Sequence, residues 1–182
     1  MLTILVGLLP LLHAEDSRTI PLDLYLIVDG SSSFQNSQSE AIAWVNSQVV
    51  DRILIGGDNI SIWNAGDTSR LVFSGAVPAS GQKGDIKNAI GTLTINGRSA
   101  DFSGALKDVA PRVSRTPQER LSCTMLITAS AEGLENTLSG DSLEFFRWFR
   151  SEKYERWQVL VIGTDITGTV RNAARSYMSS QR

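Results

Sequence analysis

Cysteine and histidine are almost missing from this chain of 182 residues, which contains one of each. Because Cys123 is alone, no disulfide can form within the chain, and its place in an apolar run indicates an ordinary buried thiol. The single histidine, His13, lies near the amino terminus. The rest of the chain therefore offers neither Ser-His-Asp nor Cys-His catalysis, and it offers no histidine-ligated zinc.

The chain also lacks a run of basic residues and a large excess of charge of either sign. It carries 17 Lys and Arg against 19 Asp and Glu, for a net charge of −2. This composition gives no indication of nucleic-acid binding. Hydrophobic residues make up 42% and charged residues 20% of the chain, the balance of a folded globular protein. The length suits one domain and is short for two.

The first fourteen residues differ from the rest. Residues 2–12 are almost entirely apolar, and His13 and Ala14 lead into a polar stretch. The apolar run is too short to cross a bilayer, which needs ~20 residues. It has the character of a secretory signal peptide, although no basic residue precedes it and Leu12 stands where a small residue is usual. We expect a signal peptide over 1–14 and a single domain over 15–182, so that the protein is secreted, periplasmic or extracellular; the alternatives are an N-terminal strand or a misplaced start codon.

Alternating strand and helix patterns predict an α/β fold. Nearly continuous apolar runs, typical of buried parallel strands, occupy 22–28, 124–127 and 158–162. Two further runs, 60–63 and 70–73, flank a turn-like segment and predict an antiparallel hairpin or a central strand beside an edge strand. We therefore expect a doubly wound, mostly parallel central sheet with helices on both faces.

Helical spacing of apolar residues places the helices between these strands. Ser37 and Glu40 match a capping box at the start of one helix, and Pro111 is expected to bend or end another. The predicted helical segments are 37–53, 85–93, a run beginning at 101, 142–151 and 169–178.

The loop directly after the first predicted strand is rich in oxygen ligands. It reads Asp29-Gly30-Ser31-Ser32-Ser33, and ligands of doubly wound sheets bind outside the carboxyl ends of the strands. Asp29, Ser31 and Ser33 supply three oxygens of the kind that Mg²⁺ and other hard cations prefer. The same composition suits a simple strand-to-helix turn, because Ser and Asp favour turns and caps. This segment alone leaves both interpretations open.

The segment 24–34, Leu-Tyr-Leu-Ile-Val-Asp-Gly-Ser-Ser-Ser-Phe, resembles the metal-ion-dependent adhesion site of von Willebrand factor A (vWA) domains. Residues 97–106 are similar to the loop of that family which carries a metal-binding Thr, and Ser99 stands at the position of that Thr. The order of elements also matches from about Pro21 to Tyr177. The resemblance implies a Rossmann-like vWA fold with Mg²⁺, Mn²⁺ or Ca²⁺ held by Asp29, Ser31, Ser33 and Ser99.

The chain departs from the family pattern in two places. Ala129 occupies the position after the fourth strand where the family has an Asp, and an alanine cannot hold a metal. Ser130, Glu132 and Asp101 are the nearby groups considered as partial replacements. With one carboxylate fewer, we expect weaker cation binding. No clear counterpart of the last strand of the family follows 158–162, which predicts a short or open sheet edge.

The resemblance implies a protein-binding or adhesion module rather than an enzyme. A cation at the loop would offer an open coordination position to an acidic residue of a protein partner, and Phe34, Gln35 and Glu132 are expected on the surrounding partner-binding surface. We expect no nucleic-acid partner and no membrane span once the signal is removed. Two alternatives stay open, namely a metal-independent structural subunit of an envelope or extracellular complex and a Mg²⁺-dependent phosphoryl-transfer enzyme. The second is disfavoured because Ser31 stands where a haloacid-dehalogenase-like pattern needs Asp.

Overall fold

A computed structural model describes residues 18–128, 154 and 157–163 of the chain. Within these residues five strands form one sheet in the order β3-β2-β1-β4-β5. The strands are β1 (Leu22–Asp29), β2 (Asn59–Ala65), β3 (Ser69–Ala76), β4 (Leu121–Thr128) and β5 (Trp157–Gly163). β1 pairs in parallel with β2 and β4, β4 pairs in parallel with β5, and β2 and β3 are antiparallel. The predicted mostly parallel sheet and the predicted hairpin are confirmed.

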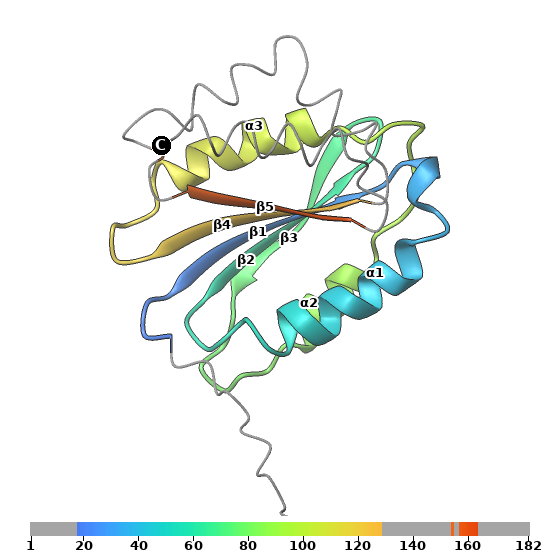
Figure 1. The fold of residues 1–182 in the computed structure, drawn as a ribbon. Helices are drawn as coiled ribbons and strands as arrows, with labels where there is room; N and C mark the ends of the chain where they lie inside the picture. The colour runs from blue at the N-terminus through green and yellow to red at the C-terminus, as the bar shows by residue number, and fades with distance from the viewer. Residues whose placement is uncertain (1–17, 129–153, 155–156, 164–182) are drawn as a thin grey trace, which may run out of the picture.

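Helices cover both faces of the sheet, as the alternating pattern predicts. Figure 1 shows α1 and α2 on one face and α3 on the other. Their bounds are α1 (Gln38–Trp44), continued by the π-helix η2 (Val45–Val50), α2 (Gly84–Gly91) and α3 (Phe102–Val113), with a short 3-10 helix η1 (Ser32–Phe34) after β1. The predicted helices at 142–151 and 169–178, and the region where a last strand would follow β5, lie outside the described residues. None of the helices in the described part is long and apolar enough to span a membrane.

The long helix predicted over 37–53 is present but changes its winding halfway. The backbone N–H of Asp51 donates to the carbonyl of Asn46 at 3.0 Å, and that of Leu54 donates to the carbonyl of Val49 at 3.1 Å. These bonds reach back five residues, as in a π-helix, and insert one extra residue into the turn. As a result Val49 and Val50, although adjacent, are both 0% exposed.

Two details of the helix predictions are wrong. Ser37 makes no side-chain cap to α1, because its backbone (φ −99°, ψ −10°) is already helical whereas a capping Ser is usually extended. Pro111 does not end α3, which continues to Val113. The capped helix is instead α3, where Asp101 Oδ1 accepts a bond of 2.8 Å from the N–H of Gly104.

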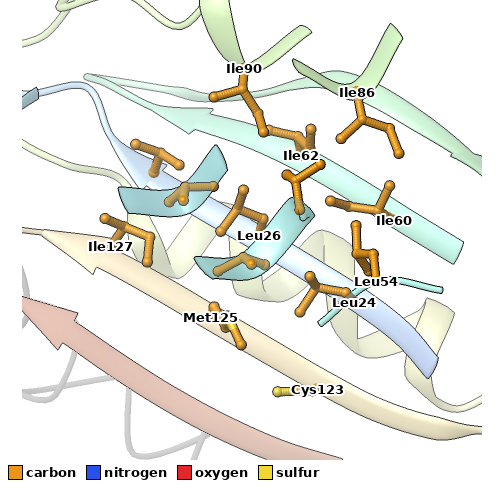
Figure 2. Close-up of a cluster of buried hydrophobic side chains, with 14 of the residues drawn as sticks. Leu24, Leu26, Leu54, Ile60, Ile62, Ile86, Ile90, Cys123, Met125 and Ile127 are labelled. Atoms are coloured by element: carbon orange, nitrogen blue, oxygen red, sulfur yellow. The ribbon is translucent and has the colours of Figure 1, made fainter. Parts of the chain in front are cut away.

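The core consists of one apolar layer on each face of the sheet. Figure 2 shows the layer beneath α1, η2 and α2, which includes Leu24, Leu26, Ile62, Ile86 and Ile90. The layer beneath α3 contains Tyr25, Ile27, Trp63, Phe102 and Leu106. Because successive side chains of a strand point to opposite faces, Asp29 follows Tyr25 and Ile27 onto the α3 side. The fold thus buries the carboxylate of Asp29 at the carboxyl end of the central strand.

Candidate metal-binding site at the carboxyl ends of the strands

Asp29 supplies the carboxylate of the candidate site. The residue is 1% exposed, and its Oδ1 accepts a hydrogen bond of 2.8 Å from the backbone N–H of Ser31. Oδ2 accepts a bond of 2.6 Å from the hydroxyl of Thr128, the last residue of β4. In the sheet, β2 lies on one side of β1, and β4 and β5 lie on the other, so the strand order reverses between β1 and β4. Doubly wound proteins bind ligands at such a point, and Asp29 lies there.

The structure brings Ser31 and Ser33 together beside Asp29. The two Oγ atoms are 2.9 Å apart, and Ser31 is buried while Ser33 is exposed. The turn of η1 creates this approach, because Ser31 is extended (φ −78°, ψ 158°) and the chain coils directly after it. Three of the four predicted metal ligands therefore lie within five consecutive residues, and the two serine hydroxyls are joined by a hydrogen bond.

Glycine allows this loop to pack against its neighbours. The N–H of Gly30 donates to the carbonyl of Ala65 at 2.7 Å, and its carbonyl accepts bonds of 2.9 and 3.1 Å from the N–H groups of Asn96 and Gly97. A Cβ at Gly30 would lie 2.2 Å from Nδ2 of Asn64. A side chain at this position would therefore separate the ends of β1 and β2 from the loop that enters α3.

Ser99, the fourth predicted ligand, reaches the same edge on this second loop. Ser31 forms an isolated bridge with Gly97, two residues before Ser99. Ser99 is exposed, and within the described residues its hydroxyl makes no hydrogen bond. The backbone N–H groups of Arg98 and Ser99 donate to Oδ1 of Asp67, at 2.7 and 3.3 Å. The structure thus places Ser99 near the other three without joining it to them directly.

Asp67 and Thr128 also contact the two loops, although no sequence motif singled them out. Asp67 lies in the β2–β3 turn and holds the loop of Ser99. Thr128 follows a run that was predicted to end at 127, and its hydroxyl holds Asp29. Both residues follow or end a strand adjacent to β1, at the carboxyl ends of the strands, where ligands of such sheets bind. This position in the sequence could have identified them.

The remaining predicted residues differ in burial and in their hydrogen bonds. Phe34 is 1% exposed and packs in the core beneath α1, so its prediction as a partner-binding surface residue is corrected: the coil of η1 turns its ring inward. Gln35 is exposed. The carboxylate of Asp101 is used locally, because Oδ1 accepts from Gly104 and Oδ2 accepts a bond of 3.0 Å from the N–H of Ser69. Ala129, Ser130 and Glu132 lie outside the described residues.

The donor set fits a hard divalent cation in type. All the candidate ligands are oxygens, which Mg²⁺, Mn²⁺ and Ca²⁺ prefer. In an octahedral shell with metal–oxygen distances of ~2.1 Å, neighbouring oxygens lie about 3.0 Å apart. The Oγ atoms of Ser31 and Ser33, which are hydrogen-bonded to each other, have a similar separation of 2.9 Å. Across the described ranges no group of three or more His, Cys, Asp or Glu side chains could hold a metal, so the negative charge at this loop comes from Asp29.

Comparison with known proteins agrees with this fold. No protein-family model matches the chain. It is 24% identical over 178 residues to an uncharacterised protein of Treponema pallidum (strain Nichols), covering 93% of this chain and 79% of that protein.

Solved structures match at the level of the fold. Proximal thread matrix protein 1 from the mussel byssus superimposes with a TM-score of 0.59 at 19% identity, over 82% of this chain and 39% of that chain. The von Willebrand factor type A protein from Catenulispora acidiphila gives 0.58 at 16% identity, over 80% and 34%. A structure of the mussel protein with zinc in its metal-ion-dependent adhesion site gives 0.57 at 20% identity, over 79% and 38%.

The chain therefore has the α/β fold of a vWA domain. It spans less than two fifths of the length of these solved chains, so the likeness concerns only part of each.

Proposed function

We propose that this protein is an exported binding module that holds a protein partner through a divalent cation at the Asp29–Ser33 loop. Asp29, Ser31 and Ser33 would bind the cation, and Ser99 would complete the set from the neighbouring loop. The observation that carries the proposal is the pair of serine hydroxyls 2.9 Å apart next to a carboxylate that is 1% exposed. The zinc-occupied site of the mussel protein, which has the same fold, supports a cation at this edge.

The proposed role is binding and not turnover. A cation held on one side by serine oxygens keeps a coordination position for an acidic side chain of the partner, while exposed neighbours such as Gln35 surround it. Glu132, which we also expect at this surface, belongs to the same proposal. A phosphoryl-transfer site of the haloacid-dehalogenase-like kind needs a second Asp two residues after the first, and this chain has Ser31 there.

Export is the second part of the proposal. The apolar segment 2–12 followed by Ala14 supports a cleaved signal peptide over 1–14. Expression of the full chain in a secreting host, followed by mass determination of the released protein, tests it. A released chain that begins at Glu15 supports export, and a protein that retains residues 1–14 inside the cell refutes it.

Thermal unfolding with EDTA and then with Mg²⁺, Mn²⁺ or Ca²⁺ tests the cation site. A cation at a hundred times its dissociation constant stabilises the native state by about 2.7 kcal/mol if it binds only that state. We expect this rise to be lost in Ser33→Ala and Asp29→Asn and retained in Ser32→Ala. Ser32 is the matched control, because it is exposed on the same loop and its hydroxyl makes no hydrogen bond within the described residues. An equal rise in the unfolding temperature of Ser32→Ala and Ser33→Ala would show that the cation does not bind at this loop.

A second candidate function is a metal-independent protein contact at the same edge. The favouring observation is that both Asp29 oxygens have protein donors, at 2.8 and 2.6 Å, so the loop is complete without a cation. In that case no cation changes the unfolding temperature. Partner capture would then be equal in EDTA and in Mg²⁺.

A further inference from the structure

A second polar site lies at the opposite end of β1. A cavity of about 300 Å³ is bounded by the first residues of β1 and β2, the last residues of β3 and the carboxyl-terminal end of α3. This volume is at the lower end of the range for small-molecule sites. The side chains that matter for its chemistry are Tyr25, Ser61, Ser74, Arg112 and Arg115, together with Asp23.

The carboxylate of this cavity is already neutralised. Asp23 Oδ1 accepts bonds from Nε of Arg120 at 2.6 Å and from Nδ2 of Asn59 at 2.8 Å. Its Oδ2 accepts a bond of 3.1 Å from the hydroxyl of Thr116. Among the described residues that line the cavity, Asp23 is the sole acidic residue. Its pairing with Arg120 therefore leaves the charges of the other arginines uncompensated.

Arg112 and Arg115 supply these charges. Arg112 lies in the last turn of α3 and Arg115 lies two residues beyond its end; neither guanidinium has an ion pair or hydrogen bond within the described part of the chain. The guanidinium carbon of Arg112 lies 5.4 Å from the ring centroid of Trp63, a residue that is 0% exposed. Arg112 is an exposed residue, and this cation–π contact holds its guanidinium beside the sheet, at the rim of the cavity.

The cavity also offers a hydroxyl donor. The Oγ atoms of Ser61 and Ser74 are 2.8 Å apart, so one hydroxyl donates to the other. The accepting hydroxyl keeps its own hydrogen for a ligand. Two guanidinium groups and a hydroxyl are donors without acceptors, which is the chemistry that recognises carboxylate and phosphate oxygens.

We propose that this cavity binds a small organic anion whose carboxylate or phosphate group is held by Arg112 and Arg115. The site is separate from the Asp29 loop, since the two lie at opposite ends of β1. It does not depend on a metal or on a protein partner. The cavity admits only a small ligand, and the donors specify an oxyanion in it.

Calorimetric titration of the full chain tests this inference with two probes, inorganic phosphate and succinate. Both titrations are done in EDTA at constant ionic strength, so that a cation at the Asp29 loop cannot capture the anion. We expect saturable binding of at least one probe, weakened tenfold or more in Arg112→Gln and in Arg115→Gln. Lys107→Gln is the matched control, because it removes one charge from an exposed position of the same helix.

Each outcome of these titrations bears on the proposal. Binding of phosphate alone identifies a phosphate ligand, and binding of succinate alone identifies a carboxylate ligand. If neither probe saturates, or if the control loses as much affinity as the arginine variants, the cavity is not an oxyanion site. Should Arg112→Gln unfold because its contact with Trp63 is lost, Arg115→Gln still decides the question.

Discussion

Arg18 is expected to stabilise the domain although it lies at the very start of the described chain. Its Nη2 atom is 2.7 Å from Oδ2 of Asp58 and its Nη1 atom is 3.2 Å from Oδ1. Nη2 also donates to the carbonyl of Ile53 at 2.9 Å. The side chain of Asp58 is 0% exposed, so Arg18→Ala leaves a buried carboxylate without its cation.

The size of the effect follows from what remains around Asp58. Removing one partner of a buried ion pair costs about 3–5 kcal/mol. Here the backbone N–H groups of Leu22 and Ile55 still donate to Asp58, at 2.8 and 2.9 Å, and the Arg18 side chain is 16% exposed. Both facts reduce the loss, and we expect Arg18→Ala to lower the free energy of unfolding by about 2–3 kcal/mol.

Urea unfolding of chains that begin at Glu15 measures this loss. With an m-value of about 2 kcal/mol/M, the midpoint should fall by roughly 1 M or more. Arg70→Ala is the control, because Arg70 is exposed on β3, carries the same charge and makes no ion pair within the described residues. A chain truncated to begin at Thr19 should lose as much stability as Arg18→Ala. If Arg18→Ala and Arg70→Ala unfold at the same midpoint, the Asp58 pair contributes nothing and the reasoning fails.

Three further predictions concern single sites. Burial raises the pKa of the Cys123 thiol from 9.0 to about 11. Because the thiol is harder to ionise in the folded state, the stability that it contributes below pH 9 is lost as the pH rises towards 11, by about 2–3 kcal/mol. The urea midpoint of Cys123→Ala should therefore fall less than that of the wild type over this pH range. In Gly104→Ala the new Cβ would lie 2.1 Å from Oδ2 of Asp101; loss of the cap should outweigh the helix preference of Ala and destabilise by about 1 kcal/mol, whereas Gly91→Ala, with nothing within 4 Å, should not destabilise. Asp67→Ala should weaken any cation affinity several-fold with less than about 1 kcal/mol of lost stability, and a cation titration that matches the wild type would show that the neighbouring loop takes no part.

The strand pattern and the loop after β1 could be predicted from the sequence because each depends on residues close together in the chain. The apolar run at 22–28 and the Asp29–Ser33 segment carry their signals locally, as period and composition. The direction of Phe34 could not be predicted, since an aromatic residue after a polar loop fits either a surface or a core. Its ring is buried because η1 coils at that point, a choice made by packing beneath α1.

The contacts that complete each site were beyond sequence reasoning because they join distant residues. Thr128 holds Asp29 from 99 positions away, and Arg18 holds Asp58 from 40 positions away. Asp58 itself lies in a Gly-Gly-Asp segment that reads as an exposed turn, yet it is 0% exposed. The carboxylate can be buried there because the Arg18 guanidinium and two backbone N–H groups donate to it. No local sequence pattern predicts these contacts.

The two ends of β1 acquire opposite chemistry from the partners of their carboxylates. At the carboxyl end Asp29 is held by a backbone N–H and a hydroxyl, neither of which carries a charge, so that edge keeps a negative charge that suits a cation. At the amino end Asp23 is paired with Arg120 while Arg112 and Arg115 have no acidic partner in the described chain, so that edge stays positive. The dipole of α3 is negative near Arg112, which favours the arginines without cancelling their full charges. The two proposed sites thus place a cation at one end of β1 and an anion at the other.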